Sequence, residues 1–135
     1  MLTAVETGPA VVVCSTCRRS PVVGENDAGR HGGALLADAL RSAKANNPAA
    51  SVIAIQEMAC LFACQRHCAV HIRAPGKIGY VLGDFIPDEG TARGILEYTL
   101  HYAASAEGEV RYADWPEAVK GHFITRTPPQ GYVVS

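Results

Sequence analysis

The sequence predicts an α/β fold in which helices flank a mixed β-sheet. Three observations predict this class. Short β-branched runs alternate with segments of helical periodicity, in the order strand, helix, strand. A tight turn at Pro75-Gly76-Lys77 then separates two further strand patterns, and a second helical segment follows. At 135 residues, 48% of them hydrophobic, the chain is expected to form one domain, residues 1–135, with its own core.

The first half of the chain predicts a strand, a helix and a second strand. Ala10–Cys14 (AVVVC) is typical of a buried strand, and the polar residues 15–30 predict a loop rich in glycine and proline. His31–Asn46 carries leucine and alanine at helical spacing, and Asn46-Asn47-Pro48 is expected to end that helix. Ser51–Gln56 (SVIAIQ) predicts the next buried strand.

The second half predicts a cysteine-rich turn, a hairpin and a helix. The turn covers Glu57–His67, and the hairpin strands are Ala69–Arg73 and Ile78–Leu82. Pro87–Ser105 presents apolar residues on one helical face, with Asp88 and Glu89 in its first turn. Residues 106–135 predict an irregular C-terminal tail.

This order of elements restricts the topology. A strand-helix-strand unit requires a parallel pair with a right-handed crossover. The following hairpin then has to extend the sheet in the antiparallel direction. The arrangement is the thioredoxin-like one, a four-stranded mixed β-sheet with flanking helices.

The cysteines follow the two parallel strands. Cys14 and Cys17 lie just past the first strand, and Cys60 and Cys64 lie just past the second, with Cys68 close by. Because the carboxyl ends of parallel strands meet at one edge of a sheet, we expect the first four thiols to converge. Thiols are kept reduced in the cytosol, so clustered cysteines there indicate a metal or redox site.

The spacing leaves several chemistries open. The C-x2-C pair and the C-x3-C pair could each hold one iron of a [2Fe–2S] cluster or half of a tetrathiolate zinc site. The two pairs are separated by 42 residues, from 18 to 59. This spacing is longer than the one usually found between the two cysteine pairs of a zinc site. Buried apolar cysteines would account for one or two of the five. Thiol–disulfide exchange is disfavoured, because that chemistry needs a helix to begin at its C-x-x-C motif.

Composition and charge exclude other classes. The formal net charge of −1 gives no basic surface for nucleic acid. The apolar stretches are too short to span a bilayer, and residues 1–6 lack the features of a secretion signal, so a cytoplasmic location is expected. No Ser-His-Asp or acid–base arrangement stands out, and we expect no enzymatic activity.

Four segments carry a family resemblance: VVVCSTCRR, CLFACQRHCAV, APGKIGYVLGDF and TRTPP. Through them the chain resembles the DUF1636 family, described as predicted metal-binding proteins of bacteria, and the thioredoxin-like [2Fe–2S] ferredoxins. The resemblance implies an electron-transfer protein with redox partner proteins, and it leaves a homodimer open. Members of the family often lie near cobalamin-biosynthesis genes, which implies a link to cobalamin or cobalt metabolism.

The ferredoxin pattern is carried over cysteine by cysteine. Cys14 matches its first position, and Cys60 and Cys64 match its last pair. The second cysteine position of the pattern is not matched at the expected distance, because Cys17 comes much earlier in the chain. Cys68 is the alternative fourth ligand. The expected ligand set is therefore Cys14, Cys17, Cys60 and Cys64, with zinc as the alternative to [2Fe–2S].

The surroundings of the cysteines carry further expectations. Backbone N–H groups of residues 61–66 are expected to bond cluster sulfurs, and Leu61 and Phe62 to shield the cluster from water. Nearby cations would ease reduction, whereas histidines in a Rieske-like pattern would be ligands. The cations are Arg18, Arg19, Arg66 and His67, and the histidines are His67 and His71. A cobalt or zinc handling protein, and a structural zinc module, remain alternative functions.

Overall fold

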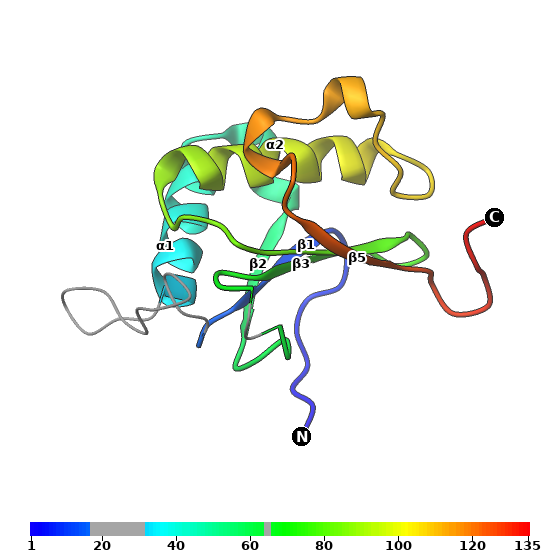
Figure 1. Ribbon diagram of the computed structural model, residues 1–135, viewed down its shortest axis with the longest axis horizontal. Helices are drawn as coiled ribbons and strands as arrows, with labels where there is room; N and C mark the ends of the chain where they lie inside the picture. The colour runs from blue at the N-terminus through cyan, green and yellow to red at the C-terminus, as the bar shows by residue number, and fades with distance from the viewer. Residues whose placement is uncertain (17–31, 64–65) are drawn as a thin grey trace.

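A computed structural model describes residues 1–16, 32–63 and 66–135 of the chain. In these residues it shows a mixed sheet of five strands, with the two α-helices packed against one face (Figure 1). The sheet order is β2-β1-β3-β4-β5. The strands are β1 (Ala10–Cys14), β2 (Ala54–Met58), β3 (Val70–Arg73), β4 (Gly79–Leu82) and β5 (Phe123–Thr127). The helices are α1 (Gly32–Ala45) and α2 (Glu89–Ala104).

The mixed α/β class is confirmed, and so is the pairing expected for the first four strands. β1 and β2 are parallel, with Ala10 opposite Ala54. β3 is antiparallel to β1 and forms a hairpin with β4. The second strand begins later than its sequence pattern predicts, because Pro48–Val52 form a short 3-10 helix. The side chain of Asn47 caps that helix by accepting a hydrogen bond from the Ala49 amide.

The expectation of an irregular C-terminal tail and a four-stranded sheet is wrong. Phe123–Thr127 form β5, an edge strand that pairs antiparallel with β4. This segment is short and lies beside proline and glycine, so its β-branched residues gave a weak signal. The unpaired edge of β4 supplies the hydrogen bonds that select the extended conformation.

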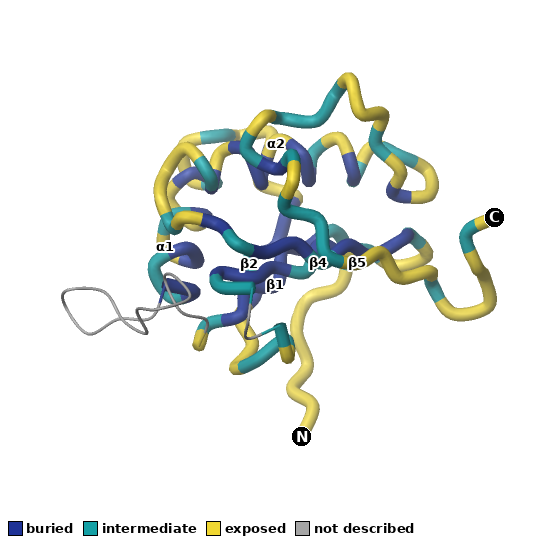
Figure 2. The backbone as a smooth tube through the Cα atoms, in the orientation of Figure 1, coloured by how far each residue is buried: buried dark blue, intermediate teal, exposed yellow. Residues whose placement is uncertain are grey.

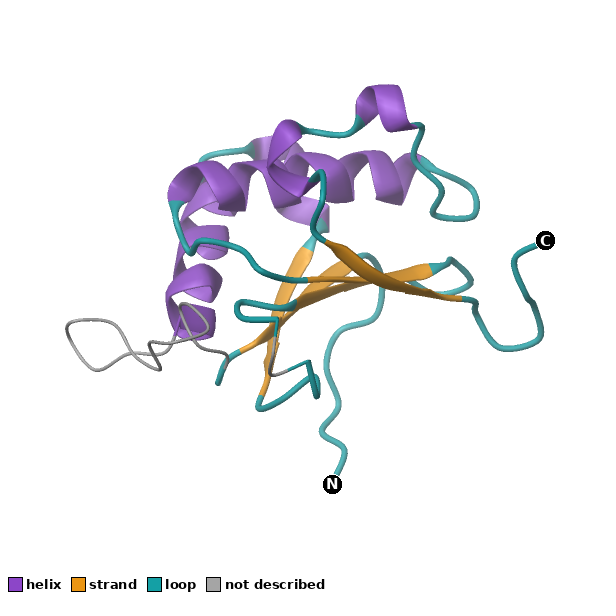
Figure 3. Ribbon diagram, in the orientation of Figure 1, coloured by secondary structure: helices purple, strands orange, loops and turns teal. Residues whose placement is uncertain are grey.

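The core lies between the helices and the sheet (Figure 3). Val11 and Val13 of β1 and Ile72 of β3 are fully buried on this face, where Leu36 and Leu40 of α1 pack. Figure 2 shows β1 buried along its length, whereas the N-terminal segment is exposed. Burial of these side chains is the main stabilising contribution to the fold, at about 1.5–3 kcal/mol each.

The start of α1 is packed directly against the end of β1. A Cβ atom added at Gly33 would lie 1.8 Å from the carbonyl oxygen of Cys14, so a larger residue does not fit. This close approach fixes the last residue of β1 against the helix. The sequence signal for it was present as Gly32-Gly33, although periodicity alone does not explain why glycine is needed.

Substitution of Gly33 by alanine tests this packing. We expect Gly33→Ala to lower the free energy of unfolding by about 1–3 kcal/mol or more, since the backbone has to move to admit the Cβ. Urea denaturation followed by circular dichroism measures the change. Gly90→Ala is the matched control, because a Cβ there meets only Asp88 Oδ1 at 3.7 Å. Equal stability of the Gly33→Ala protein and the wild type would contradict the close approach.

Candidate metal centre

The structure places three of the five cysteines at one end of the sheet. Cys14 ends β1 and is 2% exposed, Cys68 precedes β3 and is fully buried, and Cys60 lies half-buried in the loop after β2. Cys17 and Cys64, which belong to the expected ligand set, lie outside the described residues. Arg18 and Arg19 also lie outside them.

Hydrogen bonds join the loop after β1 to the loop after β2. The amide and the hydroxyl of Ser15 both donate to the carbonyl oxygen of Met58, at 2.9 and 3.0 Å. The Thr16 hydroxyl donates to the carbonyl oxygen of Ala59, and the Cys14 thiol lies 4.0 Å from the same oxygen. The expectation that these two loops meet is confirmed for the described residues. Sequence reasoning missed the two hydroxyl donors, although Ser15 and Thr16 lie within the C-x2-C motif.

A third segment, the residues just before β3, joins the same cluster. The Cys14 amide donates to the carbonyl oxygen of Ala69 at 3.0 Å. Cys14 and Ala69 form a small apolar cluster with Leu61 and Ala63, separate from the main core. The side chain of Cys14 is therefore covered by the cysteine loop, and strand alternation places it on the sheet face opposite Val11 and Val13.

The buried thiol of Cys68 is held in its neutral form. Burial raises the pKa of Cys68 to about 12, and the neighbouring Cys14 thiol adds to the increase. The backbone of Cys14 lies beside Ala69, the residue that follows Cys68, because the Cys14 amide bonds the Ala69 carbonyl oxygen. At neutral pH a metal would have to displace the proton of the Cys68 thiol in order to bind it, because only the thiolate form is a ligand.

The Cys60 loop shows one hydrogen bond of the expected kind. The amide of Phe62 donates to Cys60 Sγ at 3.2 Å, an interaction that stabilises a thiolate. Leu61 packs against Cys14, as a shielding residue would. The shielding role expected for Phe62 is wrong, because its side chain is 94% exposed. Phe62 has a φ of +58°, in the left-handed region that a phenylalanine rarely adopts.

The charged residues beside the cysteines pair with Asp84. Arg66 Nε donates to Asp84 Oδ2 at 2.6 Å, and His67 Nδ1 lies 3.7 Å from Oδ1 of the same carboxylate. Among the described residues, His67 Nδ1 is a buried atom without a hydrogen-bond partner. Asp84 has a φ of +64°, a left-handed conformation that aspartate tolerates better than most residues. The positive charge of Arg66 is therefore paired with the Asp84 carboxylate, although Arg66 also lies close in sequence to the cysteines.

The two histidines differ in their placement. His71 lies within β3, opposite Val12 of β1 and Val81 of β4. Burial lowers the pKa of His71, and Arg73 adds to the decrease, so the ring is neutral at pH 7. His67 lies in the turn itself, beside Cys68. Of the two, the structure favours His67 as a neighbour of the thiols.

Within 1–16, 32–63 and 66–135, no three His, Cys, Asp or Glu side chains form a group that could hold a metal ion. Cys17 and Cys64 lie outside these ranges. The predicted ligand set therefore stays a prediction, supported by the meeting of the loops rather than by a closed set of donors.

Comparison with known proteins identifies the family. Residues 11–129 match the family described as "Protein of unknown function (DUF1636)". The chain belongs to this family. No curated protein and no solved structure matches the chain. Membership confirms the family resemblance, whereas the relation of this DUF1636 protein to ferredoxins is not shown. In the described parts of the chain, no helix has the length and apolar character needed to cross a bilayer.

The thiols of the metal-free protein should differ in reactivity. We expect iodoacetamide at pH 8 to modify Cys60 much faster than Cys68, because Cys68 is fully buried and its thiol is protonated. Mass spectrometry of timed digests measures both rates. Unfolding in urea is the control and should make the two rates similar. Equal rates in the folded protein would contradict the burial of Cys68.

Proposed function

We propose that this DUF1636 protein binds a [2Fe–2S] cluster and transfers electrons, on a thioredoxin-like fold. The observation that carries the proposal is the meeting of three cysteine-bearing segments at one end of the sheet. Hydrogen bonds from Ser15, Thr16 and Cys14 hold these segments together. The order β2-β1-β3-β4, with a single parallel pair among these strands, supports the thioredoxin-like assignment.

The chemistry of the donors fits such a cluster. Thiolates are the usual ligands of [2Fe–2S] clusters, and amide N–H groups directed at sulfur tune the reduction potential. Phe62 supplies one such N–H to Cys60, and Leu61 and Ala63 keep Cys14 away from water. Cys14, Cys60 and Cys64 would hold the cluster together with a fourth cysteine. When bound, the cluster supplies one-electron chemistry.

Two cysteines compete for the fourth ligand position. The assignment from sequence is Cys17, which follows Cys14 by three residues. The hydrogen bond from the Cys14 amide to the carbonyl oxygen of Ala69, the residue after Cys68, supports Cys68 as the alternative. Either choice leaves one thiol outside the ligand set.

That extra thiol supports a second candidate function, the handling of cobalt or zinc. Metal transfer requires a thiol that attacks the bound ion, and a fifth cysteine beside the ligands would serve. A structural zinc site would use the same donors. The proposed partners are redox proteins in the cytoplasm or a second copy of the chain, and the proposed setting is cobalamin or cobalt metabolism.

Purification without air distinguishes these functions. We expect a coloured protein with charge-transfer bands in the visible, about two irons and two sulfides per chain, and an EPR signal after reduction by dithionite. Element analysis and absorption spectra measure these properties. A colourless protein with one zinc would reject the cluster, and cobalt that binds and is released reversibly would favour metal handling.

Serine substitutions identify the ligands. Cys14→Ser, Cys60→Ser and Cys64→Ser should each abolish cluster retention. Each should also remove the stability linked to the bound cluster, about 3 kcal/mol or more. Iron content and the melting temperature of the anaerobic protein measure the two effects.

Cys17→Ser and Cys68→Ser form the matched pair that decides the fourth ligand. If Cys17 is the ligand, only its substitution removes the cluster, and the Cys68→Ser protein keeps its iron. The reverse result would assign Cys68. Full retention of iron in both the Cys14→Ser and the Cys60→Ser proteins would contradict the site as a whole.

A further inference from the structure

The turn after β4 holds the segment that leads into β3. Asp84 follows the end of β4 by two residues. Its amide donates to the carbonyl oxygen of His67 at 2.7 Å, and its Oδ2 accepts a hydrogen bond from Arg66 Nε at 2.6 Å. One residue of the connection between β4 and α2 therefore bonds two consecutive residues of the cysteine-rich turn, once through its backbone and once through its side chain.

The two segments also pack closely against each other. A Cβ atom added at Gly83 would lie 3.0 Å from Cβ of Arg66 and 3.1 Å from the Arg66 carbonyl oxygen, so a larger residue would push Arg66 away. On its other side Gly83 is bonded to His122, the residue before β5. The Gly83 amide donates to the His122 carbonyl oxygen at 2.9 Å, and the Gly83 carbonyl oxygen lies 2.8 Å from His122 Nδ1. The turn is therefore a fixed support for Arg66.

The identity of residue 84 indicates that its side chain matters. Asp84 has a φ of +64°, a conformation that glycine adopts without the steric cost of a Cβ atom. The backbone geometry alone would therefore favour glycine at this position. What aspartate adds is a carboxylate, and that carboxylate is bonded to Arg66. A charge-assisted hydrogen bond of this kind is stronger than a neutral one.

The carboxylate faces both side chains that precede Cys68. The ion pair with Arg66 is partly shielded from water, because the side chains of Arg66 and Asp84 are 43% and 32% exposed. His67 Nδ1, a buried atom, lies 3.7 Å from the second carboxylate oxygen, Oδ1. The negative charge of Asp84 therefore lies next to the cationic or polar group of each of these two residues.

The segment held by Asp84 leads directly into the candidate metal centre. Cys68 follows His67, and the next residue, Ala69, accepts the hydrogen bond of the Cys14 amide at 3.0 Å. Cys14 has a separate support, since its carbonyl oxygen lies against Gly33 at the start of α1. Removal of the Asp84 side chain should therefore affect Cys68 more than Cys14.

We propose that Asp84 is a positioning residue of the metal centre, which holds Arg66 and His67 and thereby fixes the place of Cys68. Its carboxylate also balances the charge of Arg66, so that Arg66 eases reduction of the centre less than its position in the sequence suggests. This electrostatic part rests on the proposed function, whereas the hold on Cys68 is a property of the metal-free chain.

Alkylation of the metal-free, full-length protein tests the hold on Cys68. Asp84→Gly accepts the same backbone conformation but lacks the carboxylate. We expect iodoacetamide to modify Cys68 about tenfold faster in this variant than in the wild type, because the segment opens locally, with the rate of Cys14 unchanged. Asp84→Asn keeps an oxygen that accepts from Arg66 and should give an intermediate rate, about threefold above the wild type. Mass spectrometry of timed digests measures these rates.

Asp88→Asn is the matched control, because the Asp88 carboxylate accepts from the Thr91 amide at the start of α2. It should leave the rate of Cys68 unchanged. A merely structural role of Asp84 would raise the rates of Cys14 and Cys68 together through global unfolding, and that result would overturn the proposal. An unchanged Cys68 rate in Asp84→Gly would also overturn it. If Asp84→Gly does not fold, the selective change expected in Asp84→Asn decides in the same way.

Redox titration of the iron-loaded protein tests the electrostatic part. Asp84→Asn and Asp88→Asn each remove one negative charge, but only the first leaves the charge of Arg66 unbalanced. We expect a higher reduction potential in Asp84→Asn than in Asp88→Asn, because the reduced cluster carries one more negative charge. Equal potentials would contradict this part. A wild type that binds no cluster would contradict the proposed function instead, and the alkylation rates would still decide the role of Asp84.

Discussion

The arrangement of this protein depends on the contact made at the end of β1. The carbonyl oxygen of Cys14 lies so close to α1 that only glycine fits at position 33, while the Cys14 amide bonds the segment that enters β3. Ser15 and Thr16 then bond the residues that follow β2. One short stretch of backbone thus connects a helix and two neighbouring strands. Its side chains and those of the connected loops include the thiols of Cys14, Cys60 and Cys68.

This constraint explains why buried thiols occur in a protein with an ordinary core. Cys14 packs in the small apolar cluster with Ala69, and Cys68 packs in the main hydrophobic core. Cys68 has a φ of +50°, a conformation that costs free energy for a residue other than glycine. Strain of this kind persists where the surrounding structure over-determines it, and it accumulates at functional sites. The positive φ of Phe62, two residues after Cys60, is a second case in the same region.

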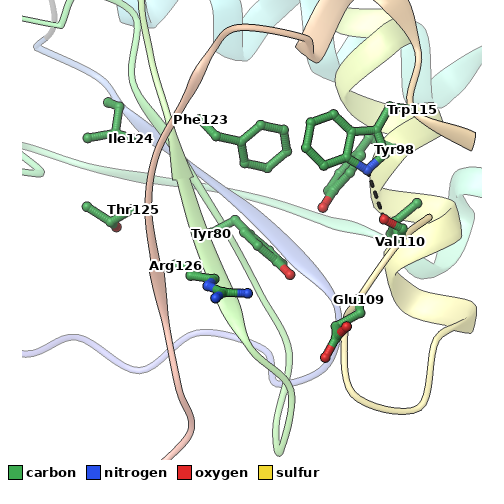
Figure 4. Close-up of a pocket in the computed structure, with 9 residues that line it drawn as sticks. All are labelled: Tyr80, Tyr98, Glu109, Val110, Trp115, Phe123, Ile124, Thr125 and Arg126. Carbon is green, nitrogen blue, oxygen red and sulfur yellow. Dashed lines mark hydrogen bonds between the residues drawn. The ribbon is translucent and has the colours of Figure 1, made fainter. Parts of the chain in front are cut away.

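The C-terminal segment completes the sheet and adds aromatic side chains to the edge of the core. β5 extends the sheet beside β4, and Phe123 at its start brings Trp115 and Tyr98 together. The same residues that complete the sheet therefore build an aromatic pocket remote from the cysteines in sequence. Phe123 of β5 packs against the ring of Tyr98 from α2 and the ring of Trp115 from the loop that precedes the strand (Figure 4).

The sequence by itself determined the family, the mixed α/β class, both helices and the first four strands, because hydrophobic periodicity and glycine or proline breaks are local signals. It also placed the cysteines after β1 and β2, since the ends of parallel strands meet at one edge. Only the tertiary structure decided that Phe123–Thr127 form a strand, that Phe62 faces solvent, and that the segment after Cys68 bonds Cys14. Each of these outcomes depends on partners distant in the chain: the open edge of β4, the turn geometry after Cys60, and the buried space beside β1. Pattern and spacing describe neighbours along the chain, and these contacts are between residues that only folding brings together.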